Sequence, residues 1–212
     1  MGEADVSKAD PSVTDWSAAH KELYARVAAE YDRQRSRAFF EKPWLDRLLA
    51  QVPAGGEVLE LGCGAGEPVT RYLAEAGCKV TALDFAAPML AIARERLPGV
   101  EFVEADMREL DLGKRFHGIV GWDSFFHLTE DEQRALLPRL AAHLAPGGVL
   151  LLTVGDKAGR VTGTVEGETV HHASLAFSDY ARLLDAEGCE VVAIVARDAR
   201  CDFHSILLAA KR

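Results

Sequence analysis

The stretch Glu57-Val58-Leu59-Glu60-Leu61-Gly62-Cys63-Gly64-Ala65-Gly66 decides how this chain folds. A short apolar run is followed by three alternating glycines, and Pro68 opens the next segment. This order predicts a buried strand, a tight turn and the start of a helix. Glycine has no Cβ atom, so such a turn can adopt positive φ and its backbone can come close to a ligand. The stretch therefore predicts a strand–turn–helix unit that binds a nucleotide-type ligand.

The spacing of the glycines narrows the choice of ligand. A dinucleotide-binding turn follows G-x-G-x-x-G and holds pyrophosphate at the helix N-terminus. Here the third glycine comes one position earlier, and Glu67 follows it. A carboxylate at that place repels pyrophosphate and tolerates an amino group or a positive charge. A phosphate-binding loop is excluded too, because no Gly-Lys-Ser/Thr follows. The turn is expected to bind a nucleoside without phosphates.

The same segment resembles motif I of the class I S-adenosyl-L-methionine (SAM)-dependent methyltransferases, E/D-x-G-x-G-x-G, and the resemblance runs from about 58 to 155. Asp84 ends the next apolar strand, where an acidic residue can bind both ribose hydroxyls. Ala105-Asp106-Met107 matches the motif that flanks the adenine. Gly118 to Asp123 matches the fourth strand, and Leu144-Ala145-Pro146-Gly147-Gly148 matches the turn before the fifth. In this order and at these intervals the pieces are specific.

The resemblance implies an α/β fold: a doubly wound, Rossmann-like sheet of seven mostly parallel strands, the last one antiparallel, with an N-terminal helical cap. The alternation of strands and helices independently predicts a parallel sheet with right-handed crossovers. We expect a disordered tail over 1–14 and a single domain over 15–212. That domain divides into the cap (15–52), the SAM-binding core (53–155), and a hairpin with C-terminal substrate-side elements (156–212).

Helices are expected at about 16–35, 43–51, 68–76, 87–96, 130–144 and 178–187, a hairpin at 160–172, and final strands at about 190–197 and 203–210. The helix from 130 has a capping box, Thr129 with Glu132. Pro138 should kink this helix or mark a later start. The two N-terminal helices are expected to lie across the cofactor as a mobile lid, tied to the core by the 53–56 linker.

Open α/β sheets bind their ligands beyond the carboxyl ends of the strands. Asp84 is expected on the ribose, Asp106 and Met107 at the adenine, and Tyr31 at the methionine end of SAM. The residues that the resemblance places on the cofactor are Tyr31, Glu60, Gly62, Gly64, Gly66, Asp84, Phe85, Asp106, Met107, Trp122 and Asp123.

Aromatic and imidazole groups crowd the end of the fourth strand, in Trp122-Asp123-Ser124-Phe125-Phe126-His127. Such groups are costly to expose without a reason. His127 is the candidate general base, with a capping or core histidine as the alternative. One of the two phenylalanines is also expected to pack under the following helix. The predicted substrate-binding residues are Tyr24, Trp44, Phe125, Phe126, His171, His172 and His204.

Whether the group His171, His172 and His204 is catalytic, structural or metal-binding stays open. No H-x-x-x-H spacing supports a metal, and none is expected.

The composition limits the partners. A chain of 212 residues with 49% hydrophobic residues can bury a proper core as one domain. A net charge of −9 counts against a nucleic-acid substrate. We interpret the local basic run Arg33-Gln34-Arg35-Ser36-Arg37 as a solvated helix end. The four cysteines form no C-x-x-C pair and are expected to be reduced thiols. Without a membrane-spanning run or a signal peptide, a cytoplasmic monomer or weak homodimer is expected.

The resemblance thus implies a methyltransferase that moves the SAM methyl group to an oxygen, nitrogen or sulfur of a small molecule, with S-adenosyl-L-homocysteine as the product. Two alternatives remain open at this point. One is a SAM-binding enzyme of another reaction type on the same fold, such as a cyclase or a decarboxylase. The other is a non-catalytic SAM-binding module.

Overall fold

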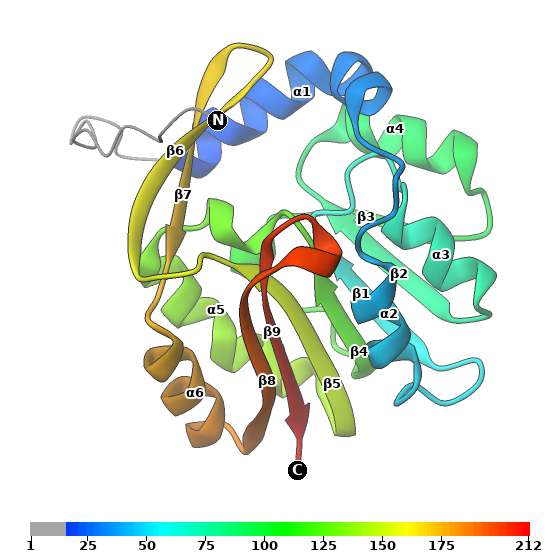
Figure 1. The fold of residues 1–212 in the computed structure, drawn as a ribbon. Helices are drawn as coiled ribbons and strands as arrows, with labels where there is room; N and C mark the ends of the chain where they lie inside the picture. The colour runs from blue at the N-terminus through cyan, green and yellow to red at the C-terminus, as the bar shows by residue number, and fades with distance from the viewer. Residues whose placement is uncertain (1–15) are drawn as a thin grey trace.

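A seven-stranded sheet forms the centre of the molecule, in a computed structural model that describes residues 16–212 (Figure 1). The strand order is β3-β2-β1-β4-β5-β9-β8, and β9 runs opposite to the other six strands. This confirms the predicted doubly wound sheet. The strands are β1 (Glu57–Leu61), β2 (Lys79–Asp84), β3 (Glu101–Glu104), β4 (Phe116–Gly121), β5 (Leu144–Val154), β8 (Cys189–Asp198) and β9 (His204–Lys211).

Helices cover both faces of the sheet, because alternate side chains of each strand point to opposite sides. Val58, for example, packs in one apolar cluster with α2 and α3, while Leu59 packs in another with α5 and α6. The helices are α1 (Trp16–Gln34), α2 (Lys42–Leu49), α3 (Val69–Glu75), α4 (Ala87–Arg96), α5 (Glu130–His143) and α6 (Phe177–Ala186), with short 3₁₀ turns η1 (Met107–Glu109), η2 (Phe125–His127) and η3 (Ala199–Cys201).

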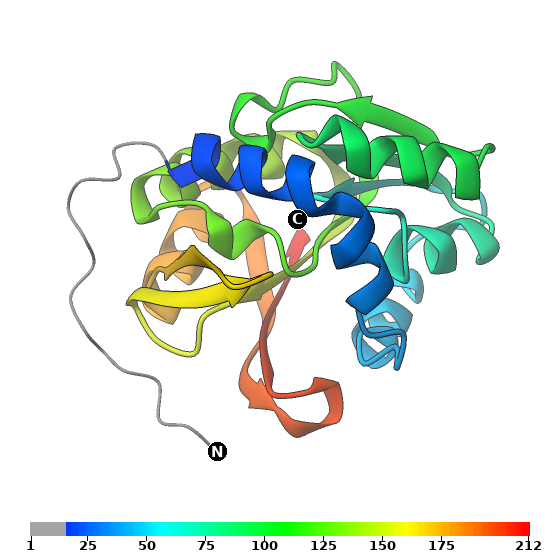
Figure 2. The ribbon, with the colours of Figure 1, turned by 90° about the horizontal axis from the view of Figure 1, so that it is seen from above.

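A separate hairpin, β6 (Gly159–Val165) with β7 (Glu168–Ser174), stands at the edge of the molecule beside α1 (Figures 1 and 2). The Trp16 ring joins the two elements. It stacks on His171 with ring centroids 4.7 Å apart, and the Arg160 guanidinium lies 4.9 Å from its ring. Arg26 of α1 also pairs with Glu168. The hairpin and α1 therefore form one boundary of the space above the strand ends.

The second predicted cap helix is part of the core instead. Trp44, Leu45 and Leu48 of α2 are buried in the same cluster as side chains of β4 and β5. A Cβ at Gly118 would stand only 3.1 Å from Leu48 Cδ2, so the glycine lets α2 pack closely on β4. The expectation that α2 lies over the cofactor is wrong, because its apolar stripe packs on the sheet. α1 alone lies across the strand ends.

Helix α5 begins at Glu130, directly after the predicted capping box of Thr129 and Glu132. The helix runs through Pro138, so of the two alternatives for this proline the later start is wrong. Within residues 16–212, no helix is both long and apolar enough to cross a membrane. The tail predicted over 1–14 lies outside the described residues.

Candidate cofactor and acceptor site

The three glycines after β1 all have positive φ, but for different reasons. A Cβ on Gly62 would stand 2.5 Å from the Cβ of Ser124, and one on Gly66 would stand 3.3 Å from the Cβ of Ala93. These two positions let neighbouring elements pack closely. A Cβ on Gly64 would meet nothing within 4 Å, although this residue lines the cavity. The turn thus leaves open space over Gly64, which suits a ligand.

The Asp84 carboxylate lies at the end of β2 and braces this turn. It accepts hydrogen bonds from the backbone N–H of Gly64 at 2.9 Å and of Ala86 at 2.8 Å. Burial raises the pKa of Asp84. Each carboxylate oxygen can accept more than one hydrogen bond, so both retain capacity for hydroxyl donors. A buried acceptor pair beside an open glycine turn fits the ribose of a nucleoside.

One cavity joins the ends of β1, β2 and β4 to α1. Ten of the eleven predicted cofactor residues line it; Gly66, which packs against α4, does not. Glu60 lines it as a buried carboxyl that accepts a hydrogen bond from the Thr70 hydroxyl at 2.5 Å, and burial raises its pKa to about 8. Asp106 caps η1 by accepting the Arg108 backbone N–H at 2.9 Å. The remaining lining positions that were predicted are Tyr31, Gly62, Gly64, Asp84, Phe85, Met107, Trp122 and Asp123.

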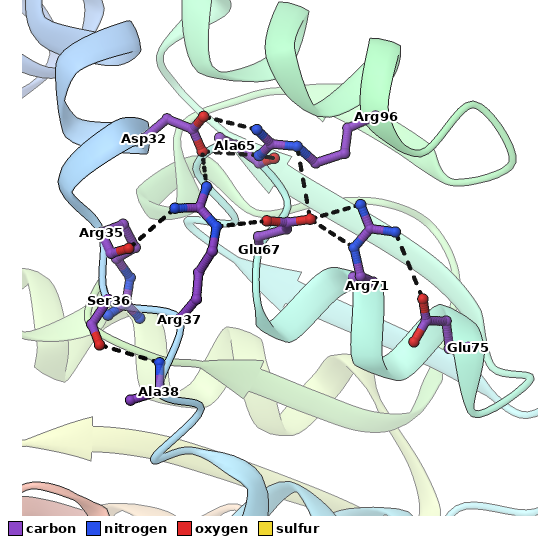
Figure 3. Close-up of polar contacts among 10 residues, drawn as sticks. All are labelled: Asp32, Arg35, Ser36, Arg37, Ala38, Ala65, Glu67, Arg71, Glu75 and Arg96. Atoms are coloured by element: carbon purple, nitrogen blue, oxygen red, sulfur yellow. Dashed lines mark hydrogen bonds and ion pairs between the residues drawn. The ribbon is translucent and has the colours of Figure 1, made fainter.

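Glu67 also lines the cavity, but its charge is compensated (Figure 3). The Arg37 Nε lies 3.0 Å and the Arg71 Nε 2.7 Å from its carboxylate, and the Arg96 Nε lies 3.8 Å away. Burial alone would raise the pKa of Glu67, yet the hydrogen bonds from the guanidinium groups outweigh it and lower that pKa. The expectation that a free carboxylate here repels pyrophosphate is therefore wrong, because Glu67 is paired with arginines. The exclusion of dinucleotides then rests on the glycine spacing.

The basic run after α1 is likewise not a solvated helix end. Arg35 lines the cavity and pairs with the buried Glu41 at 2.8 Å and with Asp123 at 3.4 Å. Arg37 and Arg96 both bind Asp32 (Figure 3). These ion pairs hold the end of α1 against the glycine turn and α4.

The other end of the cavity is formed by His20, Tyr24 and His127. The Tyr24 hydroxyl lies 3.0 Å from His127 Nε2, and His127 Nδ1 lies 3.4 Å from the His171 carbonyl oxygen. Burial, with His172 and His20 nearby, lowers the pKa of His127 to about 3. The candidate base is therefore neutral at pH 7 and has both ring nitrogens engaged.

His20 is the residue that the sequence analysis missed. It is 2% exposed and lines the cavity one helical turn before Tyr24. Its Nε2 accepts the His171 backbone N–H at 3.1 Å, and burial, with His171 and His172 nearby, lowers its pKa to about 4. The i, i+4 spacing of His20 and Tyr24 on the helix that also carries Tyr31 was the available signal.

Two predicted substrate residues lie in the core rather than in the cavity. Trp44 is 1% exposed, and its indole N–H donates to the Asp198 carboxylate at 3.0 Å. Phe125 is fully buried and faces Tyr180, with ring centroids 6.4 Å apart. Their side chains are used for packing, which corrects the expectation for both. Phe125 is the phenylalanine for which the core alternative holds.

The remaining predicted substrate residues stand behind the cavity wall. Phe126 and His172 both contact the His127 ring, with centroids 5.1 and 4.8 Å away, and His171 stacks on Trp16. His204 Nε2 lies 2.9 Å from Asp123 and its ring 5.4 Å from Trp122. Within residues 16–212, no three His, Cys, Asp or Glu side chains come together to hold a metal ion.

The fold and this cavity define a class I SAM-dependent methyltransferase. The family model described as a methyltransferase domain matches residues 58–148. The chain is 35% identical over 205 residues to a trans-aconitate 2-methyltransferase of Methylobacterium nodulans, covering 84% of this chain and 70% of that one. It is also 39% identical over 148 residues to the enzyme of the same name from Paracidovorax citrulli. That match covers 67% of this chain but only 51% of the Paracidovorax citrulli enzyme.

Solved structures agree. The SAM-bound amino pentose methyltransferase CalS10 of Micromonospora echinaspora superposes with a TM-score of 0.68 at 26% identity, covering 88% of this chain and 96% of that one. The Burkholderia thailandensis 1,6-didemethyltoxoflavin-N1-methyltransferase shares the fold, with a TM-score of 0.74 at 24% identity over 98% of this chain and 93% of that one. The chain belongs to the class I SAM-dependent methyltransferase family, and its cofactor is SAM.

Proposed function

We propose that this protein transfers the SAM methyl group to a small-molecule acceptor bound between the glycine turn and the side chains of His20, Tyr24 and His127. The observation that carries the proposal is the single cavity that joins these two ends. Bound SAM supplies a methyl group already activated on a sulfonium. The protein then mainly has to hold the acceptor in line and exclude water, which contributes up to roughly 7–11 kcal/mol.

The cofactor end divides the work of binding among neighbouring strand ends. Asp84 accepts the ribose hydroxyls, Asp106 and Met107 lie against the adenine, and Tyr31 reaches the methionine end. This assignment is supported by the open space over Gly64 and by the spare acceptor capacity of Asp84.

The acceptor's proton leaves through Tyr24 to His127. The Tyr24 hydroxyl donates to His127 Nε2, so its oxygen is free to accept a hydrogen bond from an acceptor O–H. Burial raises the pKa of Tyr24, which keeps the phenol protonated and makes it a relay between acceptor and imidazole. Such proton transfer typically contributes ~10²–10⁴-fold.

The low pKa of His127 favours oxygen as the methylated atom. An imidazole of such weak basicity is a poor acceptor for the proton of an amine. An alcohol or phenol oxygen that receives a methyl cation, however, becomes an oxonium whose proton even a weak base removes. We therefore assign an O–H group as the first candidate nucleophile.

The charges of the cavity disfavour polyanionic acceptors. Among its lining residues in the described chain, Arg35 is the basic one, and Glu41 and Asp123 already engage it. The three residues of the acceptor end are neutral at pH 7. A tricarboxylate such as trans-aconitate would be buried here without cationic partners, which is costly. We infer that this enzyme acts on neutral acceptors.

Incubation of the purified protein with SAM and a pool of alcohols, phenols, amines, thiols and trans-aconitate tests the proposal. We expect S-adenosyl-L-homocysteine together with a product heavier by one CH₂ group, formed from a neutral oxygen acceptor. SAM binding without formation of S-adenosyl-L-homocysteine across the pool would support a binding module. Conversion of SAM or of an acceptor without methyl transfer would support another reaction type on this fold.

A further inference from the structure

The backbone of one hairpin residue, His171, contacts both histidines of the acceptor end. The backbone N–H of His171 donates to His20 Nε2 at 3.1 Å. The backbone carbonyl of the same residue lies 3.4 Å from His127 Nδ1. A backbone N–H can only donate and a carbonyl oxygen can only accept, so these contacts assign the ring protons.

Both rings are thereby fixed with the proton on Nδ1. His20 accepts at Nε2, so in its neutral form Nδ1 carries the hydrogen. His127 must donate from Nδ1 to the carbonyl, so its Nε2 is left as a lone pair, and the Tyr24 hydroxyl donates to it. The low pKa values of about 4 and about 3 keep both rings neutral, which this assignment requires.

The two histidines differ in whether a ring nitrogen is left without a hydrogen-bond partner. In His127 both nitrogens have partners, whereas His20 Nδ1 is buried and has no hydrogen-bond partner. A buried donor left unpaired costs about 1–3 kcal/mol, and native proteins leave few of them. Because His20 lines the cavity, a bound molecule can supply the missing acceptor.

The surrounding structure holds this donor in place. Trp16 contacts both His171 and Arg160 of the hairpin, which ties the hairpin to α1 next to His20. At the far end of β7, the buried Gln133 amide donates to the Ala173 carbonyl at 2.7 Å. Tyr180 in turn donates to the Gln133 side chain at 2.6 Å. These contacts hold strand β7 in place at His171, through the stacked Trp16 ring, and at Ala173.

We propose that His20 recognises the acceptor by donating a hydrogen bond from Nδ1 to an oxygen next to the group that is methylated. The inference rests on the proposed function. His20 and Tyr24 are one helical turn apart on α1, so both side chains lie on the same face of the helix. The acceptor class that fits both is a neutral molecule with a carbonyl oxygen adjacent to its reactive O–H, such as an ortho-hydroxy aryl ketone.

The tautomers can be measured directly by ¹⁵N–¹H correlation of the imidazole rings in the uniformly labelled protein. His20 and His127 should both show a protonated Nδ1 and an unprotonated Nε2. His143 provides an internal reference, because its Nδ1 faces the Arg139 carbonyl at 2.8 Å and its Nε2 accepts the Leu112 N–H at 3.1 Å. A protonated Nε2 in His20 would overturn the proposal.

Recognition is tested by calorimetry of the complex with S-adenosyl-L-homocysteine, using ortho- and para-hydroxyacetophenone as probes. The ortho isomer should bind about 3- to 10-fold more tightly, the effect of one neutral hydrogen bond. His20→Gln keeps an acceptor for the His171 N–H but lacks a donor at the Nδ1 position, so it should abolish this preference. His143→Gln, a matched change outside the cavity, should leave it intact.

The outcomes separate this inference from the proposed function. Equal or undetectable binding of the two isomers to the wild-type complex, or a preference that survives His20→Gln, overturns the role of His20. Absence of S-adenosyl-L-homocysteine binding would instead count against the proposed function. Unchanged affinity for S-adenosyl-L-homocysteine in His20→Gln shows that the variant is folded and that only acceptor recognition has changed.

Discussion

The two ends of the cavity are built in different ways. The cofactor end comes from short contiguous motifs at neighbouring strand ends, where the Gly64 backbone N–H donates to the Asp84 carboxylate. The acceptor end joins α1, η2 and the hairpin, and its central contact links His20 to His171, which lie 151 positions apart. The first end is fixed by the sheet itself. The second depends on how peripheral elements pack, so it can vary while cofactor binding is kept.

The largest expected effect concerns the acceptor end. His127→Ala removes the group that takes the acceptor's proton, so kcat should fall by ~10²-fold or more with an oxygen acceptor. SAM affinity should be nearly unchanged, because the ring lies away from the glycine turn. Steady-state kinetics together with calorimetry for SAM check both statements.

Tyr24→Phe sharpens this test. If Tyr24 relays the proton to His127, the single variants and the double variant should all lose a similar factor, since the two residues act as one unit. Additive losses would contradict the relay. Normal turnover of His127→Ala would leave His127 as a structural residue.

The next largest effect concerns the cofactor end. Asp84→Ala should weaken SAM by roughly 1.5–3 kcal/mol, the range for hydrogen bonds to a charged group, which is about 10- to 100-fold in Kd. Calorimetry measures this change. Asp46→Ala, which removes an exposed carboxylate on α2, is the control and should bind SAM normally. Unchanged affinity in Asp84→Ala would disprove the ribose assignment and break the contrast between the two ends.

The same contrast explains what the sequence could predict. The β1–α3 turn and Asp84 were predictable because a motif and a strand end are local in sequence. The helical spacing could place His20 on the same face as Tyr24, but the role of His20 was not predictable, since it depends on a backbone group of the hairpin far along the chain. Trp44 was misplaced because an apolar stripe on a helix shows that a face is buried but not what covers it. Glu67 was misjudged because the arginines around it come from three separate segments.

A smaller effect separates α1 from α2. Ion pairs and hydrogen bonds tie α1 to the hairpin and to Arg96, whereas α2 is buried against the sheet. Because elements with fewer buried contacts open more readily, SAM should increase protection from hydrogen exchange in 16–34 and leave 42–49 unchanged. Hydrogen exchange with and without SAM measures this. Equal protection of α1 in both states would indicate a fixed cover, and a parallel change in α2 would mean that both helices move together.

The smallest effect is a dependence of stability on pH that arises from the pair His204 and Asp123. Burial alone would lower the pKa of His204, but the Asp123 carboxylate, 2.9 Å from its Nε2, outweighs it and raises that pKa to about 9. A folded-state pKa above the unfolded value of ~6.5 means that the pair stabilises fully below about pH 6.5 and is lost as the pH rises through about 9.

His20 and His127 act in the opposite direction. Their lowered pKa values of about 4 and about 3 add stability above about pH 6.5 that is lost as the pH falls toward those values. In urea unfolding, His204→Gln should therefore remove a stabilisation on the order of 1 kcal/mol at about pH 6 and little at about pH 10, after allowance for solvent screening. Its acid-side decline should match that of the wild type, since the acceptor-end histidines are intact. If the unfolding free energies of wild type and variant differ by the same amount at both pH values, Asp123 and His204 do not form a charged pair.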